Sequence, residues 1–447
     1  MEIRQHPTVQ QFYAIHPQGE TRQVASIDSE MLRNICLEAG ADDVGFVGVD
    51  DPAVAPQRAD IDWLMPGTQT LISFVCRMNK ENIRTPARSI SNLEFHIQTD
   101  ESNVVAQKIV SRLEALKIRA SIAGAAGFPM EADRFGGKPW TISHKPIAVA
   151  AGLGQMGIHR NVIHPKFGNF VLLGTVLVSV KVTHYTTAID YNPCLECKLC
   201  VAACPTGAIH SDGQFDFSAC YTHNYREFMG GFGDWVENIA SSRSALDYRK
   251  KVSNAETQSM WQSLSYGANY KAAYCMAVCP AGEDVIGPFL TDRKAFLDNI
   301  VKPLQQKQET VYVAANSDAE AFVARRYPHK KTKRVRNGLA GQVSVKNFLF
   351  GMPLAFQRGK SKGLSAVYHF AFTGDENCDA TVVIRDETLR VLDGHVGAPN
   401  LVVTADSQVW LRFLRKETSI VRALLTRKIK LRGSPKLLLA FGRCFPS

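Results

Sequence analysis

The sequence CLECKLCVAACP occupies residues 194–205. Its four cysteines follow the spacing C-x2-C-x2-C-x3-C-P, in which the first three thiolates wrap one turn of chain around an iron–sulfur cube. The fourth cysteine of such a motif points away from that cube and serves a second one. A zinc site ordinarily uses two separated pairs of ligands, so the spacing indicates iron–sulfur chemistry.

The three leading cysteines need a further thiolate, which bacterial ferredoxins take from a Cys-Pro pair farther along the chain. The stretch AAYCMAVCP, residues 272–280, ends in such a pair. We therefore predict a 4Fe–4S cluster on four thiolates, which are those of Cys194, Cys197, Cys200 and Cys279.

A second cluster is predicted with an incomplete set of thiolates. Cys204 and Cys275 belong to it by the same logic, and Cys220, in FSACYTH, is the natural third ligand. A complete motif would place a cysteine three residues before Cys275, where the chain has Ala272. Three readings stay open: a four-iron cluster with an oxygen or nitrogen ligand such as His223 or water, a three-iron cluster, or three buried thiols without a cluster.

The composition is that of a globular protein, because 45% of the 447 residues are hydrophobic and 21% are charged. Seven of the eleven cysteines lie between 194 and 279, and this clustering favours metal binding over a disulfide framework. No apolar run is long enough to span a membrane, and the N-terminus resembles neither a secretion signal nor a twin-arginine signal. We expect a cytoplasmic protein without a membrane span.

The pattern of apolar residues divides the chain into five parts. Strand patterns at 44–49, 70–76 and 118–124 alternate with helical patterns and indicate a layered α/β domain. Seven lysines and arginines between 325 and 336 contribute to the net charge of +10; we interpret them as a solvated linker, although such a run could contact nucleic acid or acidic lipid. The expected parts are an N-terminal extension (1–25), the α/β domain (26–185), an iron–sulfur domain (186–300), a basic linker (301–340) and a C-terminal domain (341–447).

The stretch AGLGQMG, residues 151–157, contains G-x-G-x-x-G, which is also found in dinucleotide-binding folds. A dinucleotide site would have an acidic residue about 20 positions further on, to bind the ribose. The chain there reads LLGTVLVSV. We therefore do not interpret the glycines as a nicotinamide site.

The longer stretch AGLGQMGIHRNVIHPKFGNFVLLGTVL (151–177), followed by the cysteine run, resembles epoxyqueuosine reductases and the related reductive dehalogenases. The resemblance covers roughly residues 26–300. It implies a nitroreductase-like, cobalamin-binding domain and two clusters that pass electrons singly from an external ferredoxin-like or flavodoxin-like donor to the cobalt. The matching positions are Gly152, Gly154, Gly157 and Asn161, which become cofactor-binding candidates, and His164-Pro165, Phe167-Gly168 and Leu173-Gly174.

The chain departs from this family at the catalytic acid. Epoxyqueuosine reductases carry an aspartate shortly before the glycine block, and ungapped counting places that position at Lys138. Asp133 lies close but aligns only with a gap. His144, in HKPIA at the entrance to a strand or helix, is a second candidate because a reduction needs a proton as well as electrons.

The C-terminal part of the chain also differs from the epoxyqueuosine reductase family, whose members end in helical repeats suited to tRNA. Residues from about 341 instead resemble a sterol carrier protein type 2 domain. The resemblance implies an α/β domain whose apolar tunnel binds a lipid-like ligand; an unspecialised packing module is the alternative. The stretches that carry it are ATVVIRD, LRVLDG, LVVTADSQVWLRFL and KIKLRGSPKLLLAF.

Together these patterns predict a multidomain protein of mixed α/β and α+β class with a ferredoxin-like centre. We predict an iron–sulfur oxidoreductase that passes electrons through 4Fe–4S clusters to a bound corrinoid and reduces a hydrophobic or small organic substrate. Two alternatives are kept: a non-catalytic electron-transfer or lipid-binding protein, and an epoxyqueuosine reductase acting on tRNA. A tRNA partner is not expected, because only the basic run supports it.

Overall fold

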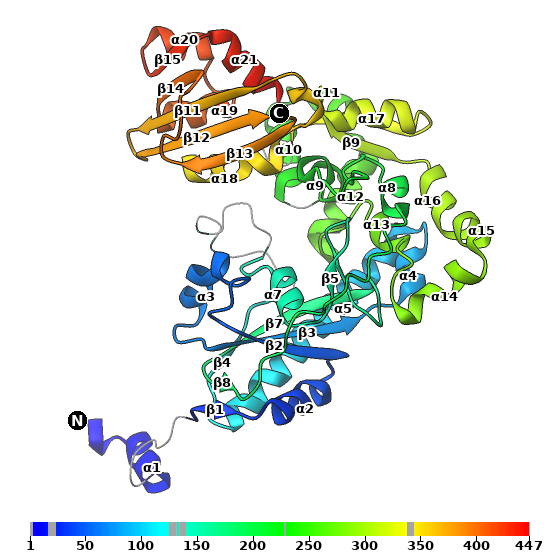
Figure 1. The fold of residues 1–447 in the computed structure, drawn as a ribbon, viewed down its shortest axis with the longest axis vertical. Helices are drawn as coiled ribbons and strands as arrows, with labels where there is room; N and C mark the ends of the chain where they lie inside the picture. The colour runs from blue at the N-terminus through cyan, green and yellow to red at the C-terminus, as the bar shows by residue number, and fades with distance from the viewer. Residues whose placement is uncertain are drawn as a thin grey trace.

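The computed structural model describes residues 3–16, 24–124, 131, 134, 140–227, 229–337 and 344–446. They form a sheet domain, a helical region and a second sheet domain, at the bottom, the right and the top of Figure 1. The expected N-terminal extension contains helix α1 (Pro7–Ile15), which stands apart from the sheet domain. No helix in the described ranges is both long and apolar enough to cross a bilayer.

The first domain is built on an antiparallel four-stranded sheet in the order β2-β3-β7-β4. Helices α2 and α5 cover one face, where Phe74 is fully buried, and α3 and α7 cover the other, where Leu71 is fully buried. All three expected strands are present, the last as the short β4. The elements are α2 (Ser29–Ala39), β2 (Asp43–Gly48), α3 (Arg58–Leu64), β3 (Thr70–Arg77), α4 (Lys80–Arg84), α5 (Arg88–Ala115), β4 (Ala120–Ile122), α7 (His144–Ala150), β5 (Gln155–Met156), β6 (Val162–Ile163) and β7 (Val171–Val178).

The iron–sulfur region is helical and has one hydrophobic core, which it shares with α4 of the first domain. Leu199 of α8, Tyr274 of α13 and Ile83 of α4 are buried together there. Residues 183–198, which lead into it, form neither helix nor strand. The helices are α8 (Leu199–Ala203), α9 (Phe217–Asn224), α10 (Met229–Ala240), α11 (Ala245–Lys251), α12 (Asn254–Tyr266), α13 (Tyr274–Ala277), α14 (Glu283–Thr291), α15 (Arg293–Phe296) and α16 (Lys302–Gln306).

The segment 301–340, which we expected to be a linker, is a packed unit within its described part. Strand β9 (Thr310–Ala314) pairs in parallel with β10 (Lys331–Val335), and α17 (Asp318–Arg326) connects them. Val311 and Val323 are fully buried in the iron–sulfur core, so this segment extends that region. The basic residues are largely paired with carboxylates instead of being free in solvent: Lys333 with Glu256, and Arg334 with Glu320.

The C-terminal domain has a five-stranded sheet in the order β13-β12-β11-β14-β15. One face packs against α18, α19 and α21 around a dense aromatic core with Trp410 and Phe370 near its centre. Strands β12 to β15 and helices α19 and α21 lie on the stretches that the sequence singles out, whereas α18, β11 and α20 lie outside them. The elements are α18 (Val345–Ala355), β11 (Ala366–Thr373), β12 (Cys378–Arg385), β13 (Thr388–Asp393), β14 (Leu401–Asp406), α19 (Ser407–Leu414), α20 (Ile420–Leu425), β15 (Ile429–Gly433) and α21 (Pro435–Arg443).

Candidate metal centre

Four cysteines surround one cavity at the start of α8. They are the four thiols that the spacing assigns to the first cluster, and Ile158 and His159 of the first domain also line the cavity. All eleven cysteines of the chain are free thiols, so none of the four is held in a disulfide. The cysteines of the cavity are Cys194, Cys197, Cys200 and Cys279.

The local backbone explains how closely spaced cysteines reach one cavity. Glu196 and Lys198 adopt left-handed conformations, with φ of 48° and 61°, and each lies between two of the cysteines. The Cys194 N–H donates to the side-chain oxygen of Asn192 at 2.9 Å, which fixes the start of the turn. Helix α8 then begins directly after Lys198.

Burial favours the protonated form of three thiols of this cavity, those of Cys197, Cys200 and Cys279, when no metal is bound. Burial raises the pKa of Cys279 to about 12, and Cys197, Cys194 and Cys275 add to the shift because thiolates repel one another. Burial also raises the pKa of Cys200. Since iron binds the thiolate, cluster insertion must release these protons, and a higher pH favours it.

The described residues contain no group of three or more His, Cys, Asp or Glu side chains close enough to hold a single metal ion. This does not conflict with an iron–sulfur site. A cube of four irons and four sulfides holds its thiolates at separate corners, farther apart than the ligands of one ion. The four thiols around one cavity are compatible with such a cluster.

Three more cysteines lie together in the same core. Burial raises the pKa of Cys275 to about 12, and the neighbouring Cys204 thiol adds to the effect. Burial likewise raises the pKa of Cys220, followed by contributions from Cys275 and Cys204. The structure thus brings together the three thiols assigned to the second cluster. Because Cys200 and Cys275 also interact, the two groups are adjacent.

The backbone around Ala272 repeats that around Cys197. Lys198, after Cys197, has φ 61° and ψ 14°, and Ala273, after Ala272, has φ 54° and ψ 24°. In both places a short helix begins at the next residue, α8 in one case and α13 in the other. Ala272 therefore occupies the place of a ligand in a second motif whose backbone is intact.

His223 is not suited to be the missing ligand. Its Nδ1 accepts a hydrogen bond from the Tyr312 N–H at 3.3 Å, so the proton of the neutral ring lies on Nε2. Burial lowers the pKa of His223 to about 4, which keeps the ring neutral. An Nε2–H has no lone pair to offer a metal. Among our alternatives for the second site, histidine ligation by His223 is the one that the geometry opposes.

The cofactor candidates of the first domain contact the chain itself. A Cβ on Gly154 would lie 2.3 Å from the Ile163 carbonyl oxygen, and one on Gly152 would lie 2.4 Å from that of Thr187. Gly157 packs against the His159 ring, and the Asn161 side-chain oxygen accepts from Lys145 Nζ at 2.9 Å. These contacts account for the glycines through close backbone packing, and their assignment to a cofactor stays a prediction.

Of the two candidate proton donors, His144 and Asp133, the structure describes His144. His144 is the first residue of α7, is buried, and has its Nδ1 2.8 Å from Thr175 Oγ1 of β7. It therefore lies against the sheet of the first domain, and its role as an acid stays a prediction. Asp133 and Lys138 lie outside the described residues.

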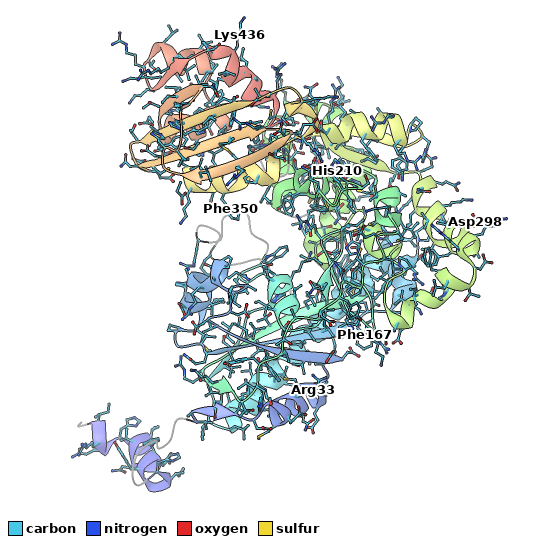
Figure 2. All side chains as sticks on the ribbon, in the orientation of Figure 1. Arg33, Phe167, His210, Asp298, Phe350 and Lys436 are labelled. Carbon is cyan, nitrogen blue, oxygen red and sulfur yellow. The ribbon has the colours of Figure 1, made fainter. Side chains whose placement is uncertain are left out.

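The sequence HPKFG, residues 164–168, joins the first domain to the iron–sulfur region. The Glu283 N–H donates to the Pro165 carbonyl at 2.9 Å, and the Asp284 N–H donates to the Lys166 carbonyl at 3.0 Å. Phe167 lies at this boundary (Figure 2). The segment that follows Cys279 is thereby fixed to the first domain, a role that the sequence pattern did not indicate.

His164 ties the same loop to strand β2. Its Nδ1 accepts from the backbone N–H groups of Lys166 and Phe167, and its Nε2 donates to Asp43 Oδ2 at 3.1 Å. Burial acts to raise the pKa of Asp43, but hydrogen bonds from His164, the Val44 N–H and Arg33 lower it to about 2. The match of His164 to the family motif therefore has a structural explanation.

Asp43→Asn is expected to lower the free energy of unfolding by about 1–2 kcal/mol at pH 7. The folded pKa of Asp43 is depressed, so its stabilising effect is present above the usual value of 3.8 and is lost as the pH falls toward 2. Urea unfolding at pH 7 and pH 3 measures this, and the difference between variant and wild type should shrink at pH 3. Asp50→Asn, at an exposed partner of Arg58, is the control. A pH-independent difference would contradict the assignment.

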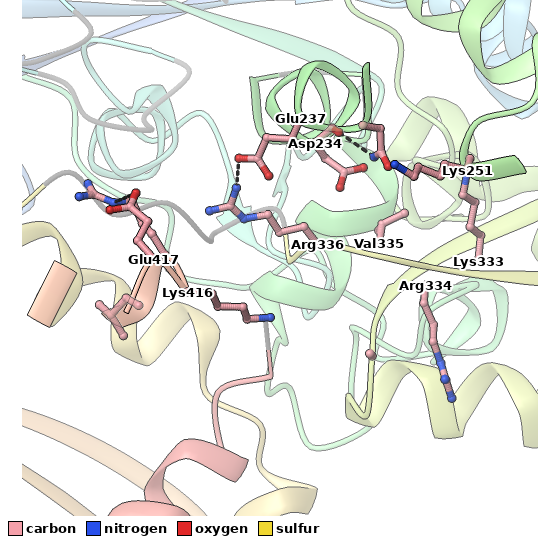
Figure 3. A pocket seen from close by; sticks show the side chains of 13 residues that line it. Asp234, Glu237, Lys251, Lys333, Arg334, Val335, Arg336, Lys416 and Glu417 are labelled. Carbon is pink, nitrogen blue, oxygen red and sulfur yellow. Dashed lines mark hydrogen bonds and ion pairs between the residues drawn. The ribbon is translucent and has the colours of Figure 1, made fainter. Parts of the chain in front are cut away.

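A larger cavity, of about 760 Å³, lies between α10, β10 and the turn after α19 (Figure 3). Its side chains are mostly charged, with six cations against three carboxylates. Arg336 pairs with Glu237 across it, as Figure 3 shows. The cavity contains no cysteine, so it is separate from the metal centre. The cations are Lys251, Lys333, Arg334, Arg336, Arg415 and Lys416, and the carboxylates are Asp234, Glu237 and Glu417.

Comparison with known proteins identifies two segments. Residues 187–210 match the 4Fe-4S binding domain family, and residues 355–446 match the SCP-2 sterol transfer family. The first match contains the predicted cysteine motif, and the second lies within the predicted C-terminal domain. The chain therefore carries a 4Fe–4S binding domain and a sterol carrier-type domain, as its sequence indicated.

The chain is also similar to curated epoxyqueuosine reductases. That of Vibrio cholerae is 25% identical over 228 residues, which are 45% of this chain and 59% of that protein. That of Listeria monocytogenes is 32% identical over 204 residues, or 43% of this chain and 49% of that protein. A solved catabolic reductive dehalogenase covers 61% of this chain and 35% of its own, at 14% identity and a TM-score of 0.38. The resemblance is thus confirmed, while the chain spans about half the length of the curated relatives it matches.

Proposed function

We propose that this protein is an iron–sulfur oxidoreductase in which two clusters carry electrons to an acceptor held by residues 26–185. The observation that carries the proposal is the cavity bounded by Cys194, Cys197, Cys200 and Cys279. The three thiols of the second group adjoin it in the same core. Adjacent clusters transfer single electrons readily, so the arrangement supplies a relay.

The acceptor implied by the resemblance to epoxyqueuosine reductases is a corrinoid. A bound corrinoid would supply a cobalt centre that can be reduced by single electrons. Lys145 supports a link from the clusters to the first domain, because it binds Asn161 and interacts with the thiols of Cys275 and Cys220. An external donor of the ferredoxin or flavodoxin class would supply the electrons.

The substrate is proposed to be hydrophobic, since a sterol carrier-type domain is part of the chain. In that domain, the fully buried Trp410 has rings of Phe348, Phe370 and Phe372 within 5.6 to 5.9 Å. Its Nε1–H has no hydrogen-bond partner among the described residues. An apolar surrounding with one donor suits a lipid-like molecule that carries a single polar group.

Anaerobic purification with iron and sulfide analysis, and with EPR and UV-visible spectra, tests the proposal. We expect about seven or eight irons per chain, and spectral changes of the corrinoid when cobalamin is added to the reduced protein. About four irons would contradict the two-cluster arrangement. Full clusters without corrinoid binding would leave a non-catalytic electron-transfer or lipid-binding protein.

Reduction of a modified nucleoside in tRNA is a second candidate function. The names of the curated relatives favour it, as does the excess of positive charge around the 760 Å³ cavity, which suits a phosphate backbone. Most of those cations are already paired with carboxylates, and the chain ends in a sterol carrier-type domain. Analysis of tRNA from a deletion strain separates the two: accumulation of epoxyqueuosine would support the tRNA function.

A further inference from the structure

Arg84, the last residue of α4, carries a buried positive charge that has few compensating partners among the described residues. Its side chain is only 7% exposed, and its guanidinium lies over the rings of Phe170 and Phe296, at 5.2 and 5.4 Å. Its Nε and Nη2 have no hydrogen-bond partner among the described residues. A buried cation in such surroundings is unfavourable unless an anion lies near it.

The first cluster would provide that anion. Helix α4 packs against α13, which leads directly to Cys279. Burial lowers the pKa of Arg84, and the two groups that oppose this are Glu81, which is exposed, and Cys279. A protonated thiol brings no charge, but a cluster on four thiolates carries a net negative charge. The surroundings of Arg84 therefore become electrically balanced only when the cluster is present.

Lys145 is the cation beside the second group of thiols, as Arg84 is beside the first. Its Nζ donates to the Arg160 carbonyl at 2.7 Å and to the Asn161 side-chain oxygen at 2.9 Å. It forms no ion pair with a carboxylate of the described residues, whereas Cys275 and Cys220 are the thiols that favour its charged form. Arg160 and Asn161 follow shortly after Ile158, which packs against the core that contains Cys204, Cys220 and Cys275, so these hydrogen bonds hold Lys145 beside that core. Arg84 and Lys145 both belong to the first domain, and each lies on the side of the boundary opposite to one group of thiols.

We propose that Arg84 and Lys145 are the counter-cations of the first and second clusters, and that they set the potentials at which the clusters accept an electron. The inference rests on the proposed function, because it requires the clusters. Reduction adds one electron, and thus one negative charge, to a cluster that keeps its four or three thiolate bonds. A neighbouring cation stabilises the reduced form and raises the potential. The external donor supplies the electron, and no proton is needed.

The test is an EPR-monitored redox titration, with dithionite as reductant, of wild type, Arg84→Met and Lys145→Met. Methionine keeps the length of the apolar side chain and removes the charge. At an applied potential near the wild-type midpoint potential, we expect the ratio of reduced to oxidised first cluster to fall about tenfold in Arg84→Met. For a one-electron couple, this equals a shift of about 59 mV in the midpoint potential. Lys145→Met should shift the second cluster by a similar factor, and each variant should shift the other cluster less.

The matched control is Arg58→Met. Arg58 is a partly exposed cation of the same domain, paired with Asp50 and Asp62, and its loss should move neither potential. A second measurement separates charge compensation from a structural role. Arg84→Met should raise the melting temperature of the metal-free protein, because it removes a charge that only the cluster balances.

Two results would overturn the inference. If both variants carry full iron and sulfide but have wild-type potentials, the cations do not act on the clusters, while the proposed function still stands. If Arg84→Met lowers the melting temperature of the metal-free protein and leaves the potential unchanged, Arg84 is a structural residue. A wild-type protein without iron would overturn the proposed function as well, so the two failures are distinguishable.

Discussion

Replacement of Gly168 by alanine is expected to deprive the first iron–sulfur cluster of one of its four thiolates and to remove between about one and four irons per chain. Gly168 has a φ of 64°, and a Cβ at this position would lie 2.0 Å from the carbonyl oxygen of Ala281. The obstacle is backbone, so no side-chain rotation relieves it. Because Ala281 lies two residues after Cys279, we expect the segment to move and to withdraw that thiolate from the cavity.

The HPKFG loop makes this effect large. Its carbonyls at Pro165 and Lys166 accept from the backbone N–H groups of Glu283 and Asp284, so a shift at Gly168 disturbs the whole contact. Together with the left-handed backbone, the clash should cost roughly 3 kcal/mol or more of stability. Iron and sulfide analysis with EPR measures the loss, and circular dichroism shows whether the helices remain.

Gly287→Ala provides the control, because Gly287 lies in α14 and a Cβ there has no neighbour within 4 Å. It should keep the full iron content and gain up to about 1 kcal/mol from helix propensity. Cys279→Ala should lose as much iron as Gly168→Ala, with the fold intact. If Gly168→Ala retains all its iron, the loop does not position Cys279.

The sequence was informative where a chemical role depends on short spacing. The motif at 194–205 predicted which thiols gather around one cavity, because the turns between them are local and each element of the motif is short. Helix α2 has signals of the same local kind: Asp28 accepts from the Met31 N–H at its start, and Gly40, with φ 115°, ends it. Cys279 is distant in sequence, but its Cys-Pro pair belongs to the same motif.

The sequence was uninformative where the role depends on contact between distant segments. Gly168 matches a family motif, yet only the structure shows that Ala281 lies against it. Arg84 is one of many arginines in the chain, and nothing beside it predicts that it is buried without a carboxylate. The segment from 301 to 340 was misjudged because seven basic residues crowd positions 325–336 and hide the apolar residues, such as Val311 and Val323, that pack into the iron–sulfur core.

Ala272→Cys is expected to complete the ligand set of the second cluster. The backbone at this position is held on both sides, since the Ala272 N–H donates to Asn224 Oδ1 at 2.9 Å and its carbonyl accepts from Arg88 Nη1 at 2.6 Å. The left-handed residue that follows it, Ala273, repeats the conformation of Lys198 after Cys197, so a cysteine here should direct its thiolate as Cys197 does. A three-iron cluster would then gain its fourth iron.

The two cluster types differ in spin, which makes the result easy to read. A three-iron cluster is paramagnetic when oxidised, and a four-iron cluster is diamagnetic in its usual oxidised form. Oxidised wild type should therefore give an EPR signal that Ala272→Cys lacks, and the iron content should rise by about one per chain. An oxidised wild-type protein that has about eight irons and gives no EPR signal would instead indicate a four-iron cluster with a non-protein ligand.

Ala273→Cys is the matched control, because it adds the same thiol one residue further along, at the left-handed position between the two ligand places. It should keep the wild-type EPR signal and iron content. If Ala272→Cys behaves in the same way as this control, the repeated backbone does not present a ligand position. In that case Cys204, Cys220 and Cys275 are best explained as buried thiols, and the electron relay consists of the first cluster alone.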